Sequence, residues 1–328
     1  MQHLSRFWQR WQGWLKIGGT AILLVYLLNT VPLANMWQQL RQLSPAALAS
    51  SFLIFTLSNA LFATAWAVAL HILGFDLPIQ TVGKLFFQSL FINNFASFIG
   101  GDSLRVYQVG RLSRRILDAT LSVLISRIVM LYAILLLAGV MTWSLANEVG
   151  WDNQAQDLGA GLTLFLLLAI PLLSFLNKKP ATVLKPQNKT SWIAHFIEKF
   201  VAVRQKLQGH TFALLLVLLL SILAQLMSAW AVWVLAVAMA MPVGWWQLLL
   251  FLSVIGIALI LPISFNGIGI REVGLVGLLT GIQIDSSQAL ALSLTTSLLV
   301  IVTSLIGGIS LLIDFLQTHR QTQNQGLP

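Results

Sequence analysis

Long apolar runs alternate with short polar or basic segments along nearly the whole of this 328-residue chain. Runs of about 18 or more apolar residues are long enough to cross the hydrocarbon of a bilayer as helices. Such runs predict simple spans at residues 17–34, 46–73, 116–144, 158–176, 211–241 and 286–313. We therefore expect an all-α polytopic integral membrane protein with about 6–8 membrane helices.

Two polar segments interrupt this pattern at corresponding places in the two halves of the chain. The first covers residues 93–105 and the second covers residues 261–272. Both contain a Ser-Phe-x-Gly sequence followed by a charged residue and a valine. Polar, helix-breaking segments that correspond between two halves of a membrane protein are a strong sequence indication of a transport site near the midplane.

Basic residues around the first break favour a re-entrant hairpin over a simple crossing. Lys84 precedes the break and Arg115 follows it, and the positive-inside rule places both on the cytoplasmic side. A hairpin over residues 79–113 satisfies that rule, because non-helical backbone at membrane depth is tolerated when it is buried in protein or lines a wet cavity. The second break then lies in a hairpin over residues 245–284 that enters from outside.

These assignments describe one domain over residues 1–328 with two related halves. Residues 1–176 hold the first hairpin, residues 211–320 hold the second, and a basic cytoplasmic loop at 177–210 joins them. Apolar residues at helical spacing in this loop predict either a helix on the inner leaflet or a linker helix packed on the bundle. Hairpins that enter from opposite sides give the halves the relation of an inverted repeat. Loop charges place both termini in the cytoplasm of a multi-pass cell-membrane protein.

Composition supports the membrane assignment and excludes several other classes. Hydrophobic residues make up 57% of the chain and charged residues only 9%, against about 25% charged in an ordinary soluble domain. The net charge of +9 resides mainly in the loops, so we expect no nucleic acid partner. The chain has no cysteine, no histidine pair at metal-ligand spacing and no P-loop motif. We therefore expect no metal site, no cofactor and no ATPase site.

Five ionisable residues fall at or near membrane depth, namely Asp102, Arg105, Arg127, Arg271 and Glu272. An unpaired charge at the bilayer centre costs about 2.5–3.5 kcal/mol on insertion scales, so such residues are candidates for function. One interpretation is internal ion pairing that sets helix register, for example Asp102 with Arg127 or Arg271 with Glu272. The other is that the arginine excess binds an anion, because a guanidinium group can donate two hydrogen bonds at once to phosphate.

Other residues of the two breaks fit an anion site as well. The glycines allow backbone N–H groups to approach an anion, and a helix that begins after each break points its positive end there. Asn93 and Asn94 fit hydrogen bonding at the hairpin tip and ligand contact equally well. The complete set of candidate binding residues is Asn94, Ser97, Gly100, Gly101, Asp102, Arg105, Arg127, Pro262, Gly267, Gly269, Arg271 and Glu272.

Taken together, these segments resemble the lysylphosphatidylglycerol synthase transmembrane, or flippase-like, domain family over about residues 17–313. The resemblance rests on Asn94, Ser97, Gly100-Gly101-Asp102, Arg105, Ser126-Arg127, Leu261-Pro262, Gly267, Gly269 and Arg271-Glu272. In full-length synthases of that family, the membrane domain moves aminoacylated phosphatidylglycerol between leaflets and a separate cytoplasmic domain makes the lipid. Because the chain stops at Pro328, soon after the last predicted span, we expect no aminoacyltransferase domain and no synthase activity.

The resemblance and the buried charges lead to three hypotheses. The first is a lipid translocase without catalytic residues that moves an anionic or zwitterionic phospholipid, or a lipid-linked headgroup, between leaflets. Its phosphate would be held by Arg105, Arg127 and Arg271. The second is an intramembrane enzyme acting on a lipid-linked substrate, for which Asp102 and Glu272 are the only candidate carboxylates. The third is a membrane scaffold for a lipid-synthesising or lipid-modifying partner enzyme.

Overall fold

The computed structural model describes residues 38–41, 43–95, 100–175, 207–259, 267 and 269–325. Every regular element in these residues is a helix, which confirms the expected all-α class. The helices are α3 (Pro45–Ile72), α4 (Ile79–Phe95), α5 (Gly100–Ser113), α6 (Ile116–Leu145), α7 (Asn153–Phe175), α9 (Thr211–Ala238), α10 (Trp245–Ala258), α11 (Ile270–Gly281) and α12 (Ser286–Gln325). The predicted span at 17–34 and most of the basic loop at 177–210 lie outside the described residues.

The long helices follow the hydropathy pattern, with differences at their ends. Stretches of α3, α6, α9 and α12 are long and apolar enough to cross a membrane. Helix α7 begins at Asn153, ahead of the predicted start at 158, and α12 continues to Gln325, beyond the predicted end at 313. Hydropathy marks only the apolar part of a helix, so helical turns made of polar residues at its ends escape the prediction.

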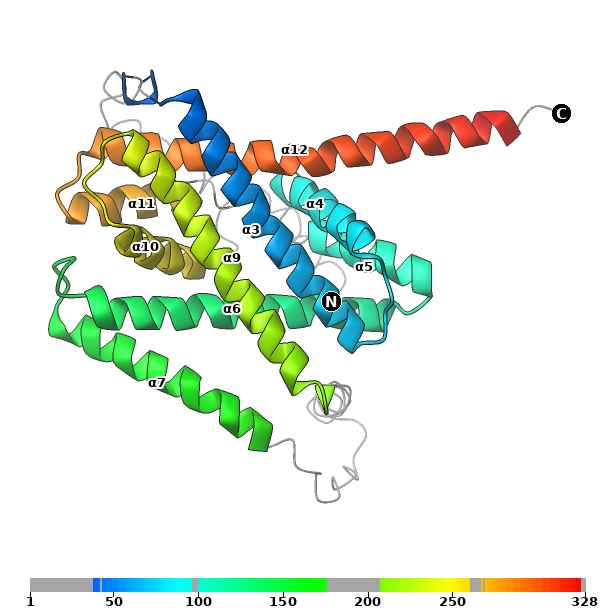
Figure 1. The fold of residues 1–328 in the computed structure, drawn as a ribbon, viewed down its shortest axis with the longest axis horizontal. Coiled ribbons are helices and arrows are strands. Elements are labelled where there is room, and N and C mark those ends of the chain that lie inside the picture. The colour runs from blue at the N-terminus through cyan, green and yellow to red at the C-terminus, as the bar shows by residue number, and fades with distance from the viewer. Residues whose placement is uncertain are drawn as a thin grey trace, which may run out of the picture.

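Small side chains bring α3 and α9 together along much of their length, and Figure 1 shows them side by side and antiparallel. The hydroxyl of Ser51 donates to the carbonyl oxygen of Ala231 over 2.8 Å, and Ser58 donates in the same way to Ala224. In a bilayer, where the lipid is as apolar as leucine, close backbone approach and such hydrogen bonds are what hold helices together. These serines are therefore packing residues.

Two pairs of short helices stand in place of two further spans. Helices α4 and α5 have 17 and 14 residues, and α10 and α11 have 14 and 12, whereas about 20 residues are needed to span a bilayer. Within each pair the helices contact one another. Figure 1 shows the α4–α5 pair at one end of the bundle and the α10–α11 pair at the opposite end. This arrangement agrees with hairpins that enter from opposite sides, while the side that faces the cytoplasm stays a prediction.

Glycine contacts set the position of α4 against its neighbours. A Cβ atom added at Gly101 of α5 would lie 2.0 Å from the carbonyl oxygen of Ser89, and one added at Gly307 of α12 would lie 1.9 Å from that of Phe87. Neither distance is possible for a real side chain, so both helices approach the α4 backbone only because these residues are glycine. Helix α4 is thus packed between α5 and α12.

A polar network continues the contact between α4 and α12. The buried amide of Gln88 donates to Ser310 over 3.1 Å and to Asp314 over 2.8 Å. Lys84, one turn earlier on α4, forms an ion pair with Asp314 at 2.6 Å. Four polar side chains therefore reinforce the glycine contact.

Each hairpin has a buried apolar cluster of its own. The cluster at the α4–α5 end includes Trp66, Leu70, Phe86, Val109 and Val123. The cluster at the α10–α11 end includes Leu235, Phe251, Leu275, Leu279 and Leu292. The two hairpins are thus packed into separate parts of the core.

Candidate functional site

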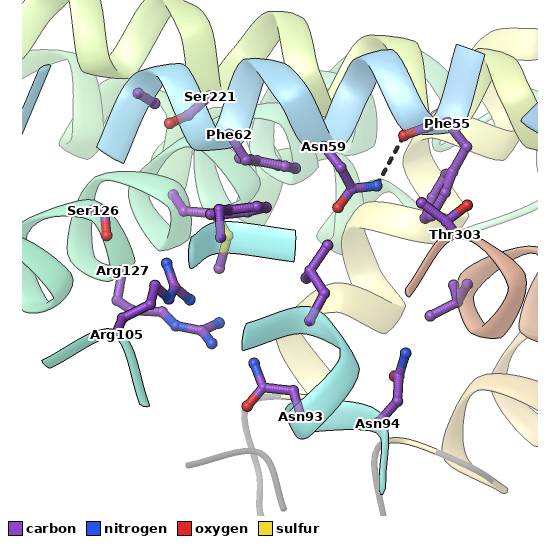
Figure 2. Close-up of a pocket in the computed structure, with 15 residues that line it drawn as sticks. Phe55, Asn59, Phe62, Asn93, Asn94, Arg105, Ser126, Arg127, Ser221 and Thr303 are labelled. Carbon is purple, nitrogen blue, oxygen red and sulfur yellow. Dashed lines mark hydrogen bonds between the residues drawn. The ribbon is translucent and has the colours of Figure 1, made fainter. Parts of the chain in front are cut away.

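A cavity of about 230 Å³ opens among α3, α4, α5, α6, α9 and α12. The middle of α3 forms part of its wall, since Asn59, near the centre of Pro45–Ile72, is one of the lining residues. Figure 2 shows the guanidinium groups of Arg105 and Arg127 pointing into it, with Asn93 and Asn94 nearby. Its polar lining consists of Asn59, Asn93, Asn94, Arg105, Ser126, Arg127, Ser221 and Thr303, and the remaining lining is apolar.

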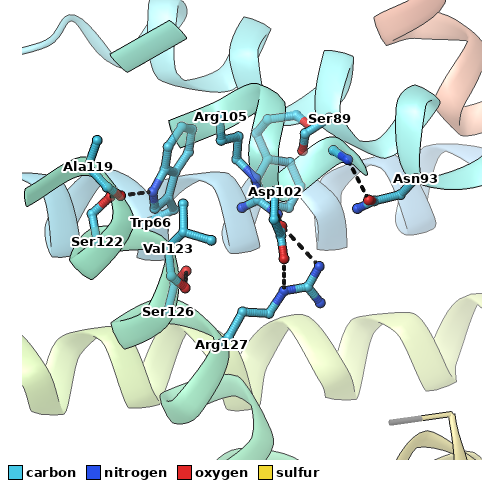
Figure 3. A network of polar contacts seen from close by, with 12 residues as sticks. Trp66, Ser89, Asn93, Asp102, Arg105, Ala119, Ser122, Val123, Ser126 and Arg127 are labelled. Atoms are coloured by element: carbon cyan, nitrogen blue, oxygen red, sulfur yellow. Dashed lines mark hydrogen bonds and ion pairs between the residues drawn. The ribbon is translucent and has the colours of Figure 1, made fainter. Parts of the chain in front are cut away.

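One carboxylate joins the two arginines of this cavity. Asp102 Oδ1 accepts from Arg105 Nη2 at 2.6 Å and from Arg127 Nη2 at 3.1 Å, and Asp102 Oδ2 accepts from Arg127 Nε at 2.9 Å. Figure 3 shows Asp102 between the two guanidinium groups. The Arg105 side chain is 5% exposed and that of Arg127 is 25% exposed. Because α5 supplies two of the charges and α6 the third, the cluster ties the α4–α5 hairpin to the long apolar helix α6.

Aromatic rings hold Arg105 in place. Its guanidinium carbon lies 5.2 Å from the centre of the Trp66 ring and 5.0 Å from that of Phe86. The Trp66 indole is itself oriented by a 3.1 Å hydrogen bond from Nε1 to Ser122 Oγ. Cation–π contacts of this kind stabilise a desolvated guanidinium group. The Nε of Arg105 nevertheless has no hydrogen-bond partner within the described part of the chain, so its donor capacity is incompletely used.

The two asparagines at the end of α4 have different contacts. Asn93 Oδ1 accepts a 2.9 Å hydrogen bond from the backbone N–H of Gly101, which ties the end of α4 to the first turn of α5. Asn93 and Asn94 both line the cavity. The hairpin-tip interpretation is thus confirmed for Asn93, and ligand contact stays a prediction for both side chains.

A second charged cluster lies at the start of α11. The buried Glu272 accepts a 2.6 Å hydrogen bond from the backbone N–H of Gly269 and another of 2.6 Å from Ser297 on α12. Arg271 Nη1 reaches the same Ser297 hydroxyl at 3.3 Å. Gly267 and Gly269 have φ angles of 77° and 90°, a region that side chains disfavour. These glycines allow the turn that leads into α11, and Glu272 caps the N-terminus of that helix.

The structure brings only part of the predicted site together. Arg105, Arg127 and Asn94 line one cavity, Asp102 pairs with both arginines beside it, and Gly100 and Gly101 begin the helix that carries Asp102 and Arg105. Arg271 and Glu272 are not among the described residues that line it. The predicted ion pair of Asp102 with Arg127 is present, whereas Arg271 and Glu272 are bridged by Ser297 instead of paired directly. Ser97 and Pro262 lie outside the described residues, and a binding role for all of these side chains stays a prediction.

Several residues of the site were not singled out from the sequence. Asn59, Ser221, Ser297 and Thr303 are polar residues within apolar spans, and that position is a signal that could have identified them. Trp66 and Phe86 gave no such signal, because an aromatic residue in a span is usually a packing residue. Their role comes from a tertiary contact with Arg105.

Charge determines what this cavity can bind. The guanidinium groups of Arg105 and Arg127 line it, and together with Asp102, which pairs with both, they carry a formal charge of +1 among the described residues. A cation surplus at membrane depth favours an anion, and planar guanidinium groups match the oxygens of phosphate. Within the described ranges, no three His, Cys, Asp or Glu residues gather in a way that could hold a metal ion.

The fold and this cavity define a polytopic α-helical membrane protein with two short-helix hairpins around a charged centre. The family model described as lysylphosphatidylglycerol synthase TM region matches residues 13–308, so the chain belongs to that family. The match confirms the resemblance seen in the sequence and indicates a membrane function related to lipids. The search of curated proteins found no match.

Proposed function

We propose that this protein is a lipid translocase that moves a phospholipid or a lipid-linked headgroup between the two leaflets. The observation that carries the proposal is the pair of arginines, bridged by Asp102, that point into a cavity among the spans. An ionisable cluster inside a membrane domain is expensive to maintain and is usually functional. Membership of a family tied to lipid synthesis supplies the substrate class.

The dimensions of the cavity fit a headgroup better than a whole lipid. Ligand pockets commonly measure about 300–1,000 Å³, and this cavity of about 230 Å³ lies just below that range. The phosphate would be held by Arg105 and Arg127 while the acyl chains stay in the bilayer. The two hairpins at opposite ends of the bundle resemble the discontinuous helices of secondary transporters, so each would control access from one side.

The orientation follows from the charges at the two ends of the bundle. Arg111, Arg114 and Arg115 stand at the α4–α5 end, whereas Asp152 and Asp285 stand at the other. We propose that the basic end faces the cytoplasm of a cell membrane and that both termini lie on that side. A cysteine introduced at Arg115 should then react only with a reagent on the cytoplasmic side, and one at Asp285 only with a reagent outside. Reaction of position 115 from outside would overturn this orientation.

Reconstitution in liposomes tests the function directly. Purified protein should move a fluorescently labelled anionic phospholipid between leaflets, as measured by loss of the inner-leaflet signal after a membrane-impermeant quencher is added outside. Arg127→Ala should reduce the rate, whereas Arg111→Ala, a matched removal of an exposed arginine at the end of α5, should leave it near that of the unsubstituted protein. A rate no higher than in protein-free liposomes would refute the proposal.

The same liposomes separate the translocase from the enzyme hypothesis. Mass spectrometry of the lipid after the assay should recover it chemically unchanged. The structure favours this outcome, because both oxygens of Asp102 already accept from arginines and both oxygens of Glu272 accept from Gly269 and Ser297. Neither carboxylate is placed as a free general base. A modified lipid would support the intramembrane enzyme instead.

A further inference from the structure

We propose that the cavity selects a phosphodiester lipid with an uncharged, hydroxyl-bearing headgroup and discriminates against headgroups that carry an ammonium group. This inference rests on the proposed function for its context, but it concerns binding and can be tested without transport. It follows from three features of the cavity: its formal charge, the way its carboxylate is already used, and the neutral acceptors around it.

The first feature is the charge. Two guanidinium groups, those of Arg105 and Arg127, line the cavity, and the carboxylate that bridges them, Asp102, is not among the described lining residues. The three side chains together carry a formal charge of +1. One phosphodiester carries one negative charge and would bring this set to neutrality. A zwitterionic headgroup adds an ammonium group to the same phosphodiester and so restores the excess of positive charge. An aminoacylated headgroup adds still more, in a buried setting where like charges repel strongly.

The second feature is that no described carboxylate is left for an ammonium group. Asp102 Oδ1 accepts from both arginines and Oδ2 accepts from Arg127. Glu272 lies outside the lining of the cavity, and its oxygens accept from Gly269 and Ser297. Asp102 is itself absent from the described lining of the cavity, so an ammonium group that reached it would have to share this carboxylate with the two guanidinium groups that already donate to it.

The third feature is a set of neutral hydroxyls. Ser126 Oγ donates to the carbonyl oxygen of Val123, and Ser221 Oγ donates to that of Val217. Each hydroxyl therefore keeps its own oxygen available as an acceptor. Thr303 Oγ1 also lines the cavity, is 1% exposed as a residue and has no hydrogen-bond partner among the described residues. Such groups suit the hydroxyls of a glycerol or similar headgroup but cannot neutralise a cation.

A binding measurement on the detergent-purified full chain tests the inference. The probes are three dioctanoyl lipids that share one phosphodiester: phosphatidylglycerol, phosphatidylethanolamine and lysylphosphatidylglycerol. We expect phosphatidylglycerol to bind at least about tenfold more tightly than the ethanolamine lipid, because a like-charge contact at a buried site costs well over one factor of ten. The lysyl lipid should bind most weakly. Equal affinities, tighter binding of either ammonium lipid, or no measurable binding of phosphatidylglycerol would overturn the inference.

A charge introduced into the cavity should change the preference in a defined direction. Ser126→Asp adds a carboxylate beside Arg127, and Ser126→Asn is its uncharged match in size. The aspartate variant should lose the preference for phosphatidylglycerol over phosphatidylethanolamine, while the asparagine variant should keep it. Thr303→Asp and Thr303→Asn repeat the comparison from α12 if either Ser126 variant fails to run as a single species on size exclusion. An unchanged preference in both aspartate variants would contradict the charge argument.

Failure of this inference is distinguishable from failure of the proposed function. Liposomes that move phosphatidylethanolamine as fast as phosphatidylglycerol, together with equal binding of the two, would overturn the selectivity and leave the translocase intact. Selective binding of phosphatidylglycerol without movement of any lipid would refute the translocase and leave the selectivity standing.

Discussion

The two hairpins carry similar residues and use them differently. Each short second helix begins after a break with an acid and an arginine in its first two turns. In α5 the acid reaches across to α6, where Asp102 pairs with Arg127 as well as with Arg105. In α11 the acid caps its own helix, where Glu272 accepts from the backbone N–H of Gly269, and its second oxygen accepts from the Ser297 hydroxyl on α12 instead of from an arginine. A shared sequence pattern therefore identifies the place of a charge but not its partner.

The difference between the two charged clusters shows where a ligand can compete for hydrogen-bond donors. The cluster at α5 borders a cavity and leaves one donor of Arg105 unused. In the cluster at α11, Glu272 accepts from a backbone N–H and a hydroxyl, and neither Arg271 nor Glu272 is among the described residues that line that cavity. We therefore expect substitutions at the first cluster to affect both stability and binding, and those at the second to affect mainly the start of α11.

The largest effect should come from removing the central carboxylate. Asp102→Asn leaves Arg105 and Arg127 without a charged partner, and breaking a buried pair in this way costs about 3–5 kcal/mol. We expect a value near the lower end, because the Asp102 side chain is 19% exposed. Glu272→Gln keeps an amide oxygen for the cap and should cost only about 1 kcal/mol. The free energy of unfolding of both variants, measured in mixed micelles, gives the difference. Equal losses of stability would show that the two acids contribute equally to the folded state.

Next in size is the effect of substitutions at Arg127 and Arg271 on lipid movement. Arg127→Ala should lower the rate by about ten- to a hundredfold, since a hydrogen bond to a charged group contributes about 1.5–3 kcal/mol. Arg127→Lys should rescue only part of it, because a point charge cannot reproduce the fork of the guanidinium group. Arg271→Ala should lower the rate less, since its described contact is a 3.3 Å hydrogen bond to Ser297. A greater loss for Arg271→Ala would move the binding site to the second hairpin.

A third comparison uses one glycine from each hairpin. Gly101→Ala places a Cβ against the carbonyl oxygen of Ser89, and overpacking of this kind costs about 1–3 kcal/mol. Gly277→Ala in α11 meets no atom within 4 Å and should stabilise the helix by up to about 1 kcal/mol. The thermal unfolding temperatures of the two variants should therefore shift in opposite directions. A loss of stability in Gly277→Ala would remove the contrast between the hairpins.

The smallest effect should belong to Ser297→Ala. The substitution removes the hydroxyl that donates to Glu272 and accepts from Arg271, and a single hydrogen bond contributes about 0.5–1.5 kcal/mol. Lipid movement should stay within about twofold of the unsubstituted rate. A loss as large as that of Arg127→Ala would show that Ser297 couples the second cluster to the transport site.

Sequence patterns predicted the parts of this molecule that depend on local composition. The spans of α3, α6 and α9 follow from apolar length, and the break before Gly100 follows from a run of amides and glycines within an apolar region. The pairing of Asp102 with Arg127 was one of two interpretations of the buried charges. This pairing could be predicted from the sequence because few residues of opposite charge lie at that depth for either Asp102 or Arg127.

What the patterns did not predict depends on tertiary packing. Trp66 and Phe86 lie on α3 and α4, and only the assembled bundle brings them to the two sides of Arg105. The separation of Arg271 from the cavity has the same origin, because the position of α11 against α12 depends on contacts such as that with Ser297. Hydropathy and charge predict how deep in the membrane a residue lies, whereas tertiary packing determines where its side chain points.

The glycine contact between α4 and α12 has a mechanical consequence. Gly307 lets the backbones meet, and Gln88 and Lys84 bind Asp314, so α4 is attached to α12 by packing, a hydrogen bond and an ion pair. The other arm of the same hairpin, α5, is joined to α6 by the ion pair of Asp102 with Arg127. The junction of α4 with α5 thus connects two arms that are attached to different long helices. Any sliding of α6 against α12 would therefore move α5 relative to α4, and the two helices contribute Arg105 and Asn94 to the cavity.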